Sequence, residues 1–266
     1  MAHKPFLKWA GGKRWFVQNH DFYLPKEFNR YIEPFLGSGA VFFHLQPNNA
    51  ILGDSNPDLI ETYQAIKDNW KLVYRYLKKH HKSHSKEYYY MIRASRPLSP
   101  YTRAARIIYL NRTCWNGLYR VNEKGIFNVP IGTRSSVISI EDNFEKISTI
   151  LSNATLVAGD FEKLIDQATN GDFIFADPPY TVRHNNNGFV KYNEKIFSWY
   201  DQERLALALN RAKKRGAFIV STNACHESVK KLYEDTFNTI IVSRNSSISS
   251  KVSTRKNFDE LIIHSN

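Results

Sequence analysis

The chain of 266 residues has only two cysteines, Cys114 and Cys225, and no apolar run near the roughly 20 residues that a membrane-spanning helix needs. Its first residues also lack the apolar stretch of a signal peptide. Because two cysteines cannot form a disulfide framework, the sequence predicts a cytoplasmic protein in a reducing compartment, without a membrane partner.

Grouped metal ligands are lacking as well. His80, His81 and His84 lie among lysines without neighbouring acids, and no Cys/His group has the spacing of a metal site. We interpret these histidines as part of a solvated helix end, and we predict a functional site without metal.

Acidic side chains are nearly absent from residues 71–120. Glu87 is the single acid there against twelve lysines and arginines, so the segment carries a charge of +11, and the whole chain carries +12. Tyrosines and Trp115 are interleaved with these cations. Since phosphates attract cations and bases stack on aromatic rings, the segment predicts a nucleic-acid surface. For several of the lysines the alternative is a solvated helical face.

An apolar run at 172–175 leads into residues 176–180, which are Ala-Asp-Pro-Pro-Tyr. The two prolines fix their own φ, donate no N–H and push the preceding residues out of the α region. A buried strand would therefore end in a stiff tip that offers carboxylate and carbonyl oxygens beside one aromatic ring. Such a tip suits an amino group on a flat heterocycle, and the alternative is a proline-rich turn without a function.

A glycine turn separates a predicted strand at 30–35 from a predicted helix at 40–45. Gly37 and Gly39 would let backbone N–H groups and the positive end of the helix come close to a ligand. Phe42 stands where the dinucleotide-binding fingerprint needs its third glycine, which weakens a nicotinamide or flavin function.

Asp54 ends the next apolar stretch, 50–53, and follows Gly37 by 17 residues. An acid at about this spacing meets ribose hydroxyls in related folds. It could instead cap the helix that is predicted to begin near Pro57, and both roles can hold at once.

Near the N-terminus, residues 5–13 combine Trp9 and Lys13 with two adjacent glycines. The glycines permit close backbone approach to a ligand, whose ring could stack on the tryptophan and whose carboxylate could pair with the lysine. The alternative is a mobile arm with an exposed glycine turn.

Strand-like and helical patterns alternate, as in an α/β fold with a parallel sheet, over residues 30–45, 50–68 and 155–243. A helix is predicted over 201–215 with Gly216 as its stop, and 239–242 is expected to pair antiparallel with 260–263. The alternation stops at 69–140, where the pattern is helical and then rich in turns. We therefore expect a catalytic domain made of 1–68 and 141–266, with a helical domain inserted at 69–140.

Together these motifs resemble the DNA adenine methyltransferase (Dam) family, including its restriction-system relatives. The resemblance covers nearly the whole chain and depends on motifs in one order, at residues 6–13, 33–39, 42–43, 54, 116–120, 127–130, 177–180 and 254–256. It implies an adenine-N6 methyltransferase that uses S-adenosyl-L-methionine, forms S-adenosyl-L-homocysteine and needs no metal. The implied fold is a Rossmann-like, mostly parallel seven-stranded sheet with an inserted helical target-recognition domain.

The resemblance also implies roles for single residues. The catalytic positions are Asp177, Pro178 and Tyr180. The cofactor positions are Trp9, Lys13, Phe35, Gly37, Asp54, Asp160, Phe161 and Asp177. The DNA-binding positions are Lys8, Trp115, Asn116, Leu118, Arg120, Asn122, Pro130 and Arg134.

The implied partner is double-stranded DNA, from which the target adenine is flipped out, and the expected site is GATC. Arg120 is expected to pair with a guanine edge. Thr133-Arg134 departs from the Arg-Tyr usual in the family, so Arg134 replaces the missing arginine or the outer base pair is recognised more loosely. We expect a monomer of bacterial or phage origin, associated with the nucleoid.

Two alternatives stay open from the sequence. One is methylation of an amino group in RNA or protein, because related enzymes have Asn-Pro-Pro-Tyr-like tips; the acid at position 177 and the basic insert disfavour it. The other is a catalytically silent DNA-binding module, which the intact glycine turn, Asp54 and Asp177 disfavour.

Overall fold

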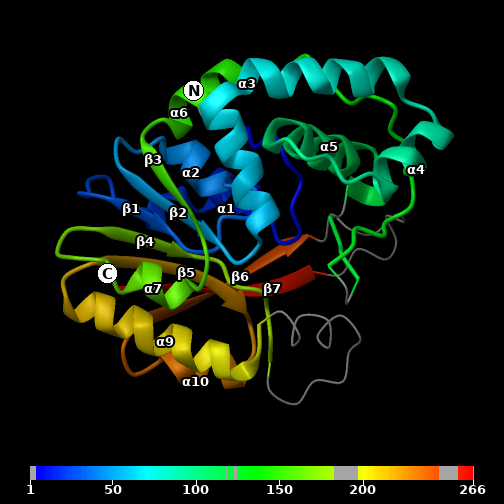
Figure 1. The fold of residues 1–266 in the computed structure, drawn as a ribbon. Helices are drawn as coiled ribbons and strands as arrows, with labels where there is room; N and C mark the ends of the chain where they lie inside the picture. Colours follow the sequence, from blue (N-terminus) through cyan, green and yellow to red (C-terminus); the bar gives the residue numbers. More distant parts are fainter. Residues whose placement is uncertain (1–3, 118, 123–124, 183–196, 246–256, 266) are drawn as a thin grey trace. The chain divides into compact units, whose positions relative to one another are not determined.

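The computed structural model describes residues 4–117, 119–122, 125–182, 197–245 and 257–265. Its strands are β1 (Tyr31–Glu33), β2 (Ala50–Asp54), β3 (Ala154–Ala158), β4 (Phe173–Ala176), β5 (Phe218–Ala224), β6 (Asn238–Asn245) and β7 (Asn257–His264). They form one sheet in the order β3-β2-β1-β4-β5-β7-β6 (Figure 1). The pairs β1–β4, β2–β3 and β4–β5 are parallel, and β7 is antiparallel to both β5 and β6. The predicted mostly parallel, seven-stranded α/β sheet is confirmed.

Contacts along the chain divide it into two compact units. Unit 1 consists of residues 1–20 and 36–159, and unit 2 consists of residues 21–35 and 160–266. The predicted insert, 69–140, lies wholly within unit 1, and its limits as a separate domain stay a prediction.

In unit 1, β2 and β3 pair from Ala50 opposite Ala154 to Asp54 opposite Ala158. The helices of this unit are α1 (Arg14–Asn19), α2 (Ala40–Leu45), α3 (Pro57–Ser83), α4 (Lys86–Ala94), α5 (Pro100–Thr113) and α6 (Phe144–Leu151). The helices predicted at 40–45 and near Pro57 are therefore both present. Among the described parts of the chain, no helix is both long and apolar enough to cross a membrane.

Helix α3 changes direction at Asn69, whose backbone is not helical (φ −154°, ψ 73°; Figure 1). The Asn69 side chain accepts the Leu72 N–H at 3.0 Å, as an N-cap residue does, so the helix begins again after the kink. Tyr63 is buried before the kink and Leu77 after it, and His80 of the second half stacks on Tyr109 of α5. The change in sequence pattern at residue 69 thus corresponds to a kink within one helix.

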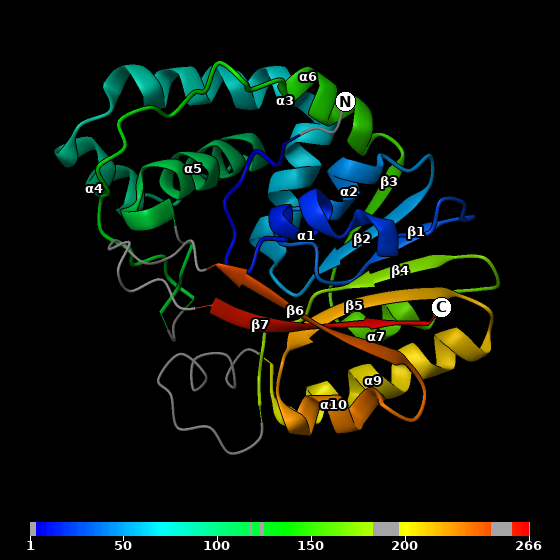
Figure 2. The same ribbon diagram turned by 180° about the vertical axis from the view of Figure 1, so that it is seen from behind.

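In unit 2, the antiparallel pair predicted at 239–242 and 260–263 is confirmed, with Ile240 opposite Ile262. Helices α7 (Phe161–Ile165), α9 (Trp199–Lys214) and α10 (Glu227–Tyr233) lie on one side of β4–β7 in both views (Figures 1 and 2). Helix α9 begins before the predicted residue 201, because Ser198 and Asp201 form a reciprocal capping box.

Strand β4 explains why the chain carries an apolar run rather than an alternating pattern just before Asp177. All four of its residues are buried, and it pairs in parallel with β1 on one edge and β5 on the other. A parallel strand covered on both faces needs apolar side chains at every position. The acid therefore comes at the carboxyl end of a central strand, the edge of an open α/β sheet at which ligands bind.

Candidate functional site

The glycine turn of unit 1 is held against Asp54. The Gly37 N–H donates to Asp54 Oδ2 at 3.0 Å, and the Leu36 N–H donates to the Gly53 carbonyl at 2.7 Å. Gly37 has φ +48°, and a Cβ there would lie 3.0 Å from Trp9 Cδ1. Both the backbone conformation and the contact with Trp9 thus require glycine. The structure brings together three predicted cofactor residues, Trp9, Gly37 and Asp54.

Asp54 does not cap α3; the cap is Asn56. The Asn56 side chain accepts the N–H groups of Asp58 and Leu59 at 3.0 and 3.3 Å. Asp54 instead accepts the Asn56 N–H at 3.0 Å with Oδ1, while Oδ2 holds the glycine turn. Burial raises the pKa of Asp54, and the two backbone N–H groups act in the opposite direction. Of the two roles expected for this acid, the helix cap is therefore wrong.

The N-terminal segment is held in place by contacts with the rest of unit 1. Asn111 on α5 accepts the Lys8 N–H at 2.9 Å and donates to the Lys8 carbonyl at 2.7 Å. Trp9 stacks on Tyr119, with ring centroids 5.0 Å apart and planes 18° apart. Lys13 is 3% exposed, and its Nζ donates to the Gly11 carbonyl at 2.7 Å. The segment is therefore packed against unit 1, while its glycine turn, Gly11-Gly12, is exposed.

Predicted DNA-binding residues gather in the segment after α5. The Trp115 N–H donates to the Pro130 carbonyl at 2.9 Å, and the backbones of Cys114 and Ile131 form an antiparallel β-bridge. The two ends of the segment therefore lie side by side. Trp115 is 55% exposed, an unusual position for a large ring. Lys8 also reaches this segment, because a Cβ on Gly117 would lie 2.6 Å from Lys8 Cδ.

Between these ends, residues 120–122 and 125–127 lie side by side as the two arms of a short hairpin. Val121 bridges Phe127, and Asn122 Oδ1 accepts the Ile126 N–H at 3.0 Å. Asn122 therefore joins the two arms through its side chain, and Arg120 lies exposed at the base of the hairpin. Asn116 is exposed next to Trp115. Leu118, another predicted DNA-binding residue, lies outside the described residues, as does the 254–256 motif.

A basic groove of about 620 Å³ lies in unit 1 along residues 4–8 and 133–143. Its two acids, Glu141 and Asp142, pair with Lys4 and Arg112. Lys8, Arg14 and Arg134 line the groove, together with Ser135 and Ser136. Burial, followed by the charges of Arg134 and Arg14, lowers the pKa of Lys8. Because the charges of Arg14 and Arg134 both act on Lys8, this part of the groove favours an anionic occupant such as a phosphate.

Four of the twelve cations in 71–120 have structural roles. Arg112 forms two hydrogen bonds with Asp142, at 2.5 and 2.8 Å, and also binds the Phe6 carbonyl. Arg106 donates to two carbonyls at the end of α4, Arg93 donates to the Val129 carbonyl, and Arg103 pairs with Glu61. These four arginines therefore contribute to the packing of unit 1, and the nucleic-acid surface stays a prediction for the block.

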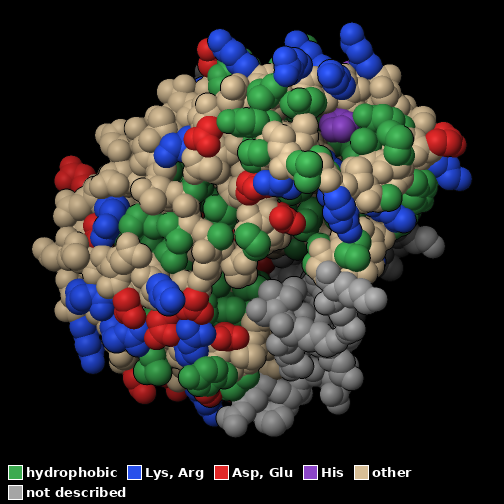
Figure 3. All heavy atoms as spheres, in the orientation of Figure 1, with side chains coloured by type: hydrophobic (Ala, Val, Ile, Leu, Met, Phe, Trp, Pro, Cys, Tyr) green, Lys and Arg blue, Asp and Glu red, His purple; other side chains and the backbone are tan. Residues whose placement is uncertain are grey.

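The other cations of this block include an exposed group on the second half of α3 (Figure 3). They are Lys71, Arg75, Lys78, Lys79 and Lys82. Lys78 and Lys79 lie over the rings of Tyr74 and Tyr76, at 4.7 and 5.4 Å from the centroids. Aromatic side chains on this face therefore serve partly to hold the cations of the same helix.

In unit 2, the tip after β4 is fixed by its neighbours. Thr222 on β5 donates its hydroxyl to Asp177 Oδ1 at 2.8 Å, and Gln202 on α9 donates to the Pro179 carbonyl at 3.3 Å. Among the described residues, none donates a hydrogen bond to the Pro178 carbonyl. The tip thus presents the Asp177 carboxylate and the Pro178 carbonyl as acceptors, held by contacts from β5 and α9.

Tyr180 is oriented through its hydroxyl group, which donates to Glu260 Oε2 on β7 at 2.6 Å. Burial raises the pKa of Tyr180 well above its ordinary value, and the charges of Asp177 and Glu260 act in the same direction. The phenol therefore stays neutral and keeps its proton on the hydrogen bond. Sequence reasoning missed Glu260, although an acid inside an apolar strand such as 260–263 is a usable signal.

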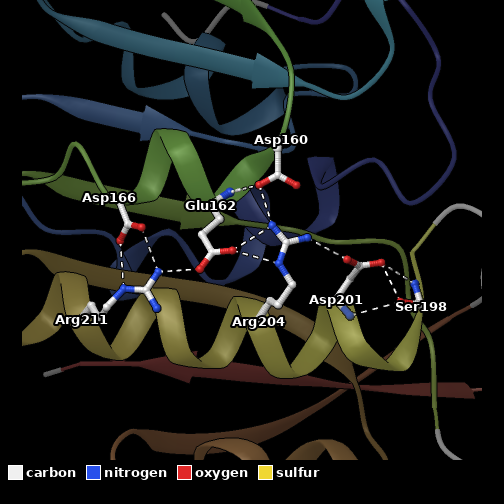
Figure 4. A network of polar contacts seen from close by, with 7 residues as sticks. All are labelled: Asp160, Glu162, Asp166, Ser198, Asp201, Arg204 and Arg211. Carbon is white, nitrogen blue, oxygen red and sulfur yellow. Dashed lines mark hydrogen bonds and ion pairs between the residues drawn. The ribbon is translucent and has the colours of Figure 1, made fainter.

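The other predicted cofactor residues of unit 2 also lie together. Phe161 stacks on Phe35 with centroids 5.3 Å apart, and Phe197 packs against both rings. Asp160 caps α7 by accepting the Glu162 N–H at 3.0 Å, and it pairs with Arg204 of α9 (Figure 4). Arg204 was missed, since nothing in the sequence places α9 beside α7.

Known proteins resemble this chain over most of its length. A model of the D12 class N6 adenine-specific DNA methyltransferases matches residues 9–248. Type II methyltransferase M1.LlaDCHI of Lactococcus lactis subsp. cremoris is 37% identical over 98% of this chain and 94% of its own length. Type II methyltransferase M.MjaIII of Methanocaldococcus jannaschii is 36% identical over 88% of this chain and 89% of its own length.

The DNA adenine methylase of Haemophilus influenzae is 33% identical over 98% of this chain and 93% of its own length. These similarities disfavour RNA or protein as the substrate and extend over both units. The chain belongs to the D12 class of N6 adenine-specific DNA methyltransferases.

Proposed function

We propose that the protein transfers a methyl group from S-adenosyl-L-methionine to N6 of an adenine within a short duplex site, and that this site is GATC. The acceptor tip carries the proposal, because Asp177 is held by Thr222 at 2.8 Å at the carboxyl end of β4. A carboxylate beside two prolines offers only hydrogen-bond acceptors, which suits an aromatic amino group with two N–H donors.

The chain has residues suited to this cofactor. In unit 1 the proposed cofactor residues are Trp9, Lys13, Gly37 and Asp54, where the glycine turn leaves no room for a Cβ beside Trp9. In unit 2 they are Phe35, Asp160, Phe161 and Asp177. When bound, the cofactor supplies an electrophilic methyl group on a sulfonium.

The adenine amino nitrogen is a weak nucleophile because its lone pair is delocalised into the ring. We propose that the Asp177 carboxylate and the Pro178 carbonyl accept its two N–H groups, which favours a pyramidal and more nucleophilic nitrogen. The Tyr180 ring, held through Glu260 at 2.6 Å, would lie against the base. These fixed acceptors stabilise the developing positive charge without reorganising, and the protein needs no metal for this step.

A base inside a duplex is out of reach of this tip, so the target adenine must be flipped out at a cost of a few kcal/mol. We propose that Trp115 or Asn116 fills the gap it leaves, because Trp115 is 55% exposed beside Pro130. Arg120 would pair with a guanine, while Leu118 and Pro130 contact a thymine methyl and Asn122 shapes the hairpin. Lys8 and Arg134 of the basic groove would meet DNA phosphates or the outer base pair.

Methylation-sensitive sequencing of genomic DNA treated with the purified protein and cofactor tests the proposal. We expect N6-methyladenine in every GATC site and in no other tetranucleotide. Methylation of a different sequence would remove the GATC assignment but keep the reaction, while a complete lack of methylation would leave only DNA binding. Sedimentation with and without a duplex would test the expected monomer.

A further inference from the structure

Arg204 on α9 binds three carboxylates at the start of α7 and of its own helix (Figure 4). Its Nη2 donates to Asp160 Oδ1 at 2.8 Å, its Nε to Glu162 Oε2 at 2.9 Å, and its Nη1 to Asp201 Oδ1 at 3.0 Å. Its guanidinium carbon also lies 4.9 Å from the ring centroid of Phe161. One side chain therefore contacts both Asp160 and Phe161, the two residues of α7 proposed for the cofactor.

The two oxygens of Asp160 are used differently. Oδ1 accepts both the Glu162 N–H at 3.0 Å and the Arg204 guanidinium. Among the described residues, none donates to Oδ2, and the side chain is 38% exposed. Asp160 is thus held through one oxygen, and the other is available to an N–H group that the described chain does not supply.

Arg204 is itself firmly held. Burial alone would lower its pKa, but the hydrogen bonds to Asp160, Glu162 and Asp201 outweigh burial and raise the pKa. Asp201 in turn belongs to the capping box with Ser198, whose N–H and hydroxyl it accepts at 2.9 and 2.7 Å. The guanidinium therefore stays charged and is oriented before any ligand arrives.

We propose that Arg204 is a positioning residue for the adenosyl end of the cofactor: it holds Oδ1 of Asp160 so that Oδ2 can accept the exocyclic amino group of a bound adenine. A carboxylate accepts hydrogen bonds and donates none, so this arrangement selects a 6-amino purine over a 6-oxo purine. The inference depends on the proposed use of S-adenosyl-L-methionine.

A purely structural role, a clamp between α7 and α9, is the competing explanation. Arg211 provides a matched control, because it joins the same two helices. It donates to Glu162 Oε1 at 2.7 Å and to both oxygens of Asp166 at 3.1 and 2.9 Å, but it has no contact with Asp160. Removing either arginine should loosen the helices, whereas only Arg204 should affect the ligand.

Calorimetric titration with S-adenosyl-L-homocysteine, which has no methyl group to transfer, compares wild type, Arg204→Gln and Arg211→Gln. We expect about 10-fold weaker binding for Arg204→Gln, as for a lost hydrogen bond of a charged pair, and less than about a twofold change for Arg211→Gln. Thermal melting of the same samples measures the structural effect. Equal losses of affinity in both variants, or none in Arg204→Gln, would overturn the proposal.

The 6-oxo analogue, S-inosylhomocysteine, tests selectivity. Wild type should bind it at least about 10-fold more weakly than the adenosyl compound, and Arg204→Gln should narrow that ratio. An unchanged ratio in Arg204→Gln would contradict the proposed role. If wild type binds neither compound, the proposed cofactor is wrong. If wild type binds S-adenosyl-L-homocysteine and Arg204→Gln binds it equally well, only the proposed role of Arg204 is wrong.

A double-mutant cycle with Asp160→Asn separates an effect of Arg204 through Asp160 from a general loss of packing between α7 and α9. If Arg204 acts through Asp160, the two losses of affinity should not multiply. The double variant should then bind S-adenosyl-L-homocysteine at most about threefold more weakly than the single variant that has the lower affinity. In turnover, the KM for the cofactor should rise while kcat at saturation changes by less than about threefold. Multiplicative losses of affinity, or a fall in kcat alone, would assign Arg204 a different role.

Discussion

Single side chains at the carboxyl end of β4 have separate structural and chemical functions. Thr222 directs Asp177 with a 2.8 Å hydrogen bond, and Glu260 directs Tyr180 with one of 2.6 Å. Neither partner was visible in the sequence motif, yet both decide where the acceptors and the ring point. The proposed acceptors and ring belong to the motif, whereas the hydrogen bonds that orient them come from β5 and β7.

Replacing Asp177 with alanine should abolish methyl transfer and leave DNA binding largely intact. One lost charged acceptor at the reacting nitrogen should slow the reaction about 100-fold or more. Single-turnover methylation of a GATC duplex measures the rate, and a gel-shift assay measures the affinity. Asp235→Ala, a change at an exposed acid, is the control. A residual rate above roughly a tenth of wild type would show that Asp177 is not the acceptor.

Arg120→Ala should relax the preference at one guanine of the site. A bidentate arginine–guanine pair discriminates by about 1–3 kcal/mol, so substituted sites should compete better with GATC. Methylation rates on duplexes with single base changes measure this effect. Lys79→Ala, on the exposed face of α3, should change affinity without changing preference. Uniform weakening by Arg120→Ala across all sequences would make it a phosphate contact.

At the scale of elements, the glycine turn requires a backbone that other residues adopt with difficulty. Gly37 has φ +48°, and a Cβ added there would lie only 3.0 Å from Trp9 Cδ1. Gly159 offers a matched position without these demands, because nothing lies within 4 Å of a Cβ there.

Gly37→Ala should therefore weaken binding of S-adenosyl-L-homocysteine about 10-fold, since the left-handed residue is strained by about 1 kcal/mol and Trp9 must move. Gly159→Ala should keep affinity within about twofold. Calorimetric titration of both variants, with thermal melting to confirm folding, compares the two. Equal affinities would mean that the Gly37 turn does not contribute to the cofactor site.

His80 packs among α3, α4 and α5, so the expectation of a solvated helix end is wrong for this histidine. Burial lowers the pKa of His80 from 6.5 to about 4, and its Nδ1 lies 2.8 Å from the Tyr88 hydroxyl oxygen. The unfolded chain therefore binds a proton at a higher pH than the folded chain. Below pH 6.5 this difference favours unfolding, and the effect grows until the pH reaches about 4.

Stability should accordingly fall between pH 6.5 and pH 4, with His80 contributing about 3 kcal/mol at most. Urea unfolding across this range measures the loss. His80→Gln should make the pH dependence shallower, whereas His81→Gln, a change at the exposed neighbour, should not. If the two variants depend on pH alike, His80 is not the responsible group.

At the scale of the whole molecule, the cations behind the net charge of +12 differ in what they contact. Arg112 and Arg106 bind groups of the protein, whereas Lys8 and Arg134 line an open groove. Binding of duplex DNA should depend steeply on salt, with a log–log slope near −5 for about six neutralised phosphates. Fluorescence anisotropy at several salt concentrations measures it. Arg134→Ala should reduce the slope by about 1, and a slope near zero would contradict a phosphate-binding surface.

The sequence by itself determined the sheet, the acceptor tip, the glycine turn and the family. Each of these is local: apolar runs fix a buried parallel strand, prolines stiffen the tip, and a left-handed turn needs glycine. Composition also indicated a basic nucleic-acid surface, but it could not separate Arg120 from Arg112, because both are arginines in a segment with one acid.

Only the tertiary structure decided which groups hold the functional residues. Asn56 rather than Asp54 caps α3, Asn69 kinks that helix, and Arg204 meets Asp160 across 44 positions of the chain. Such partners come from elements that pack side by side, and no periodicity along one segment records which elements will be neighbours. A motif therefore specifies the chemistry in advance, while the long-range hydrogen bonds that orient it follow from the packing of the sheet and its helices.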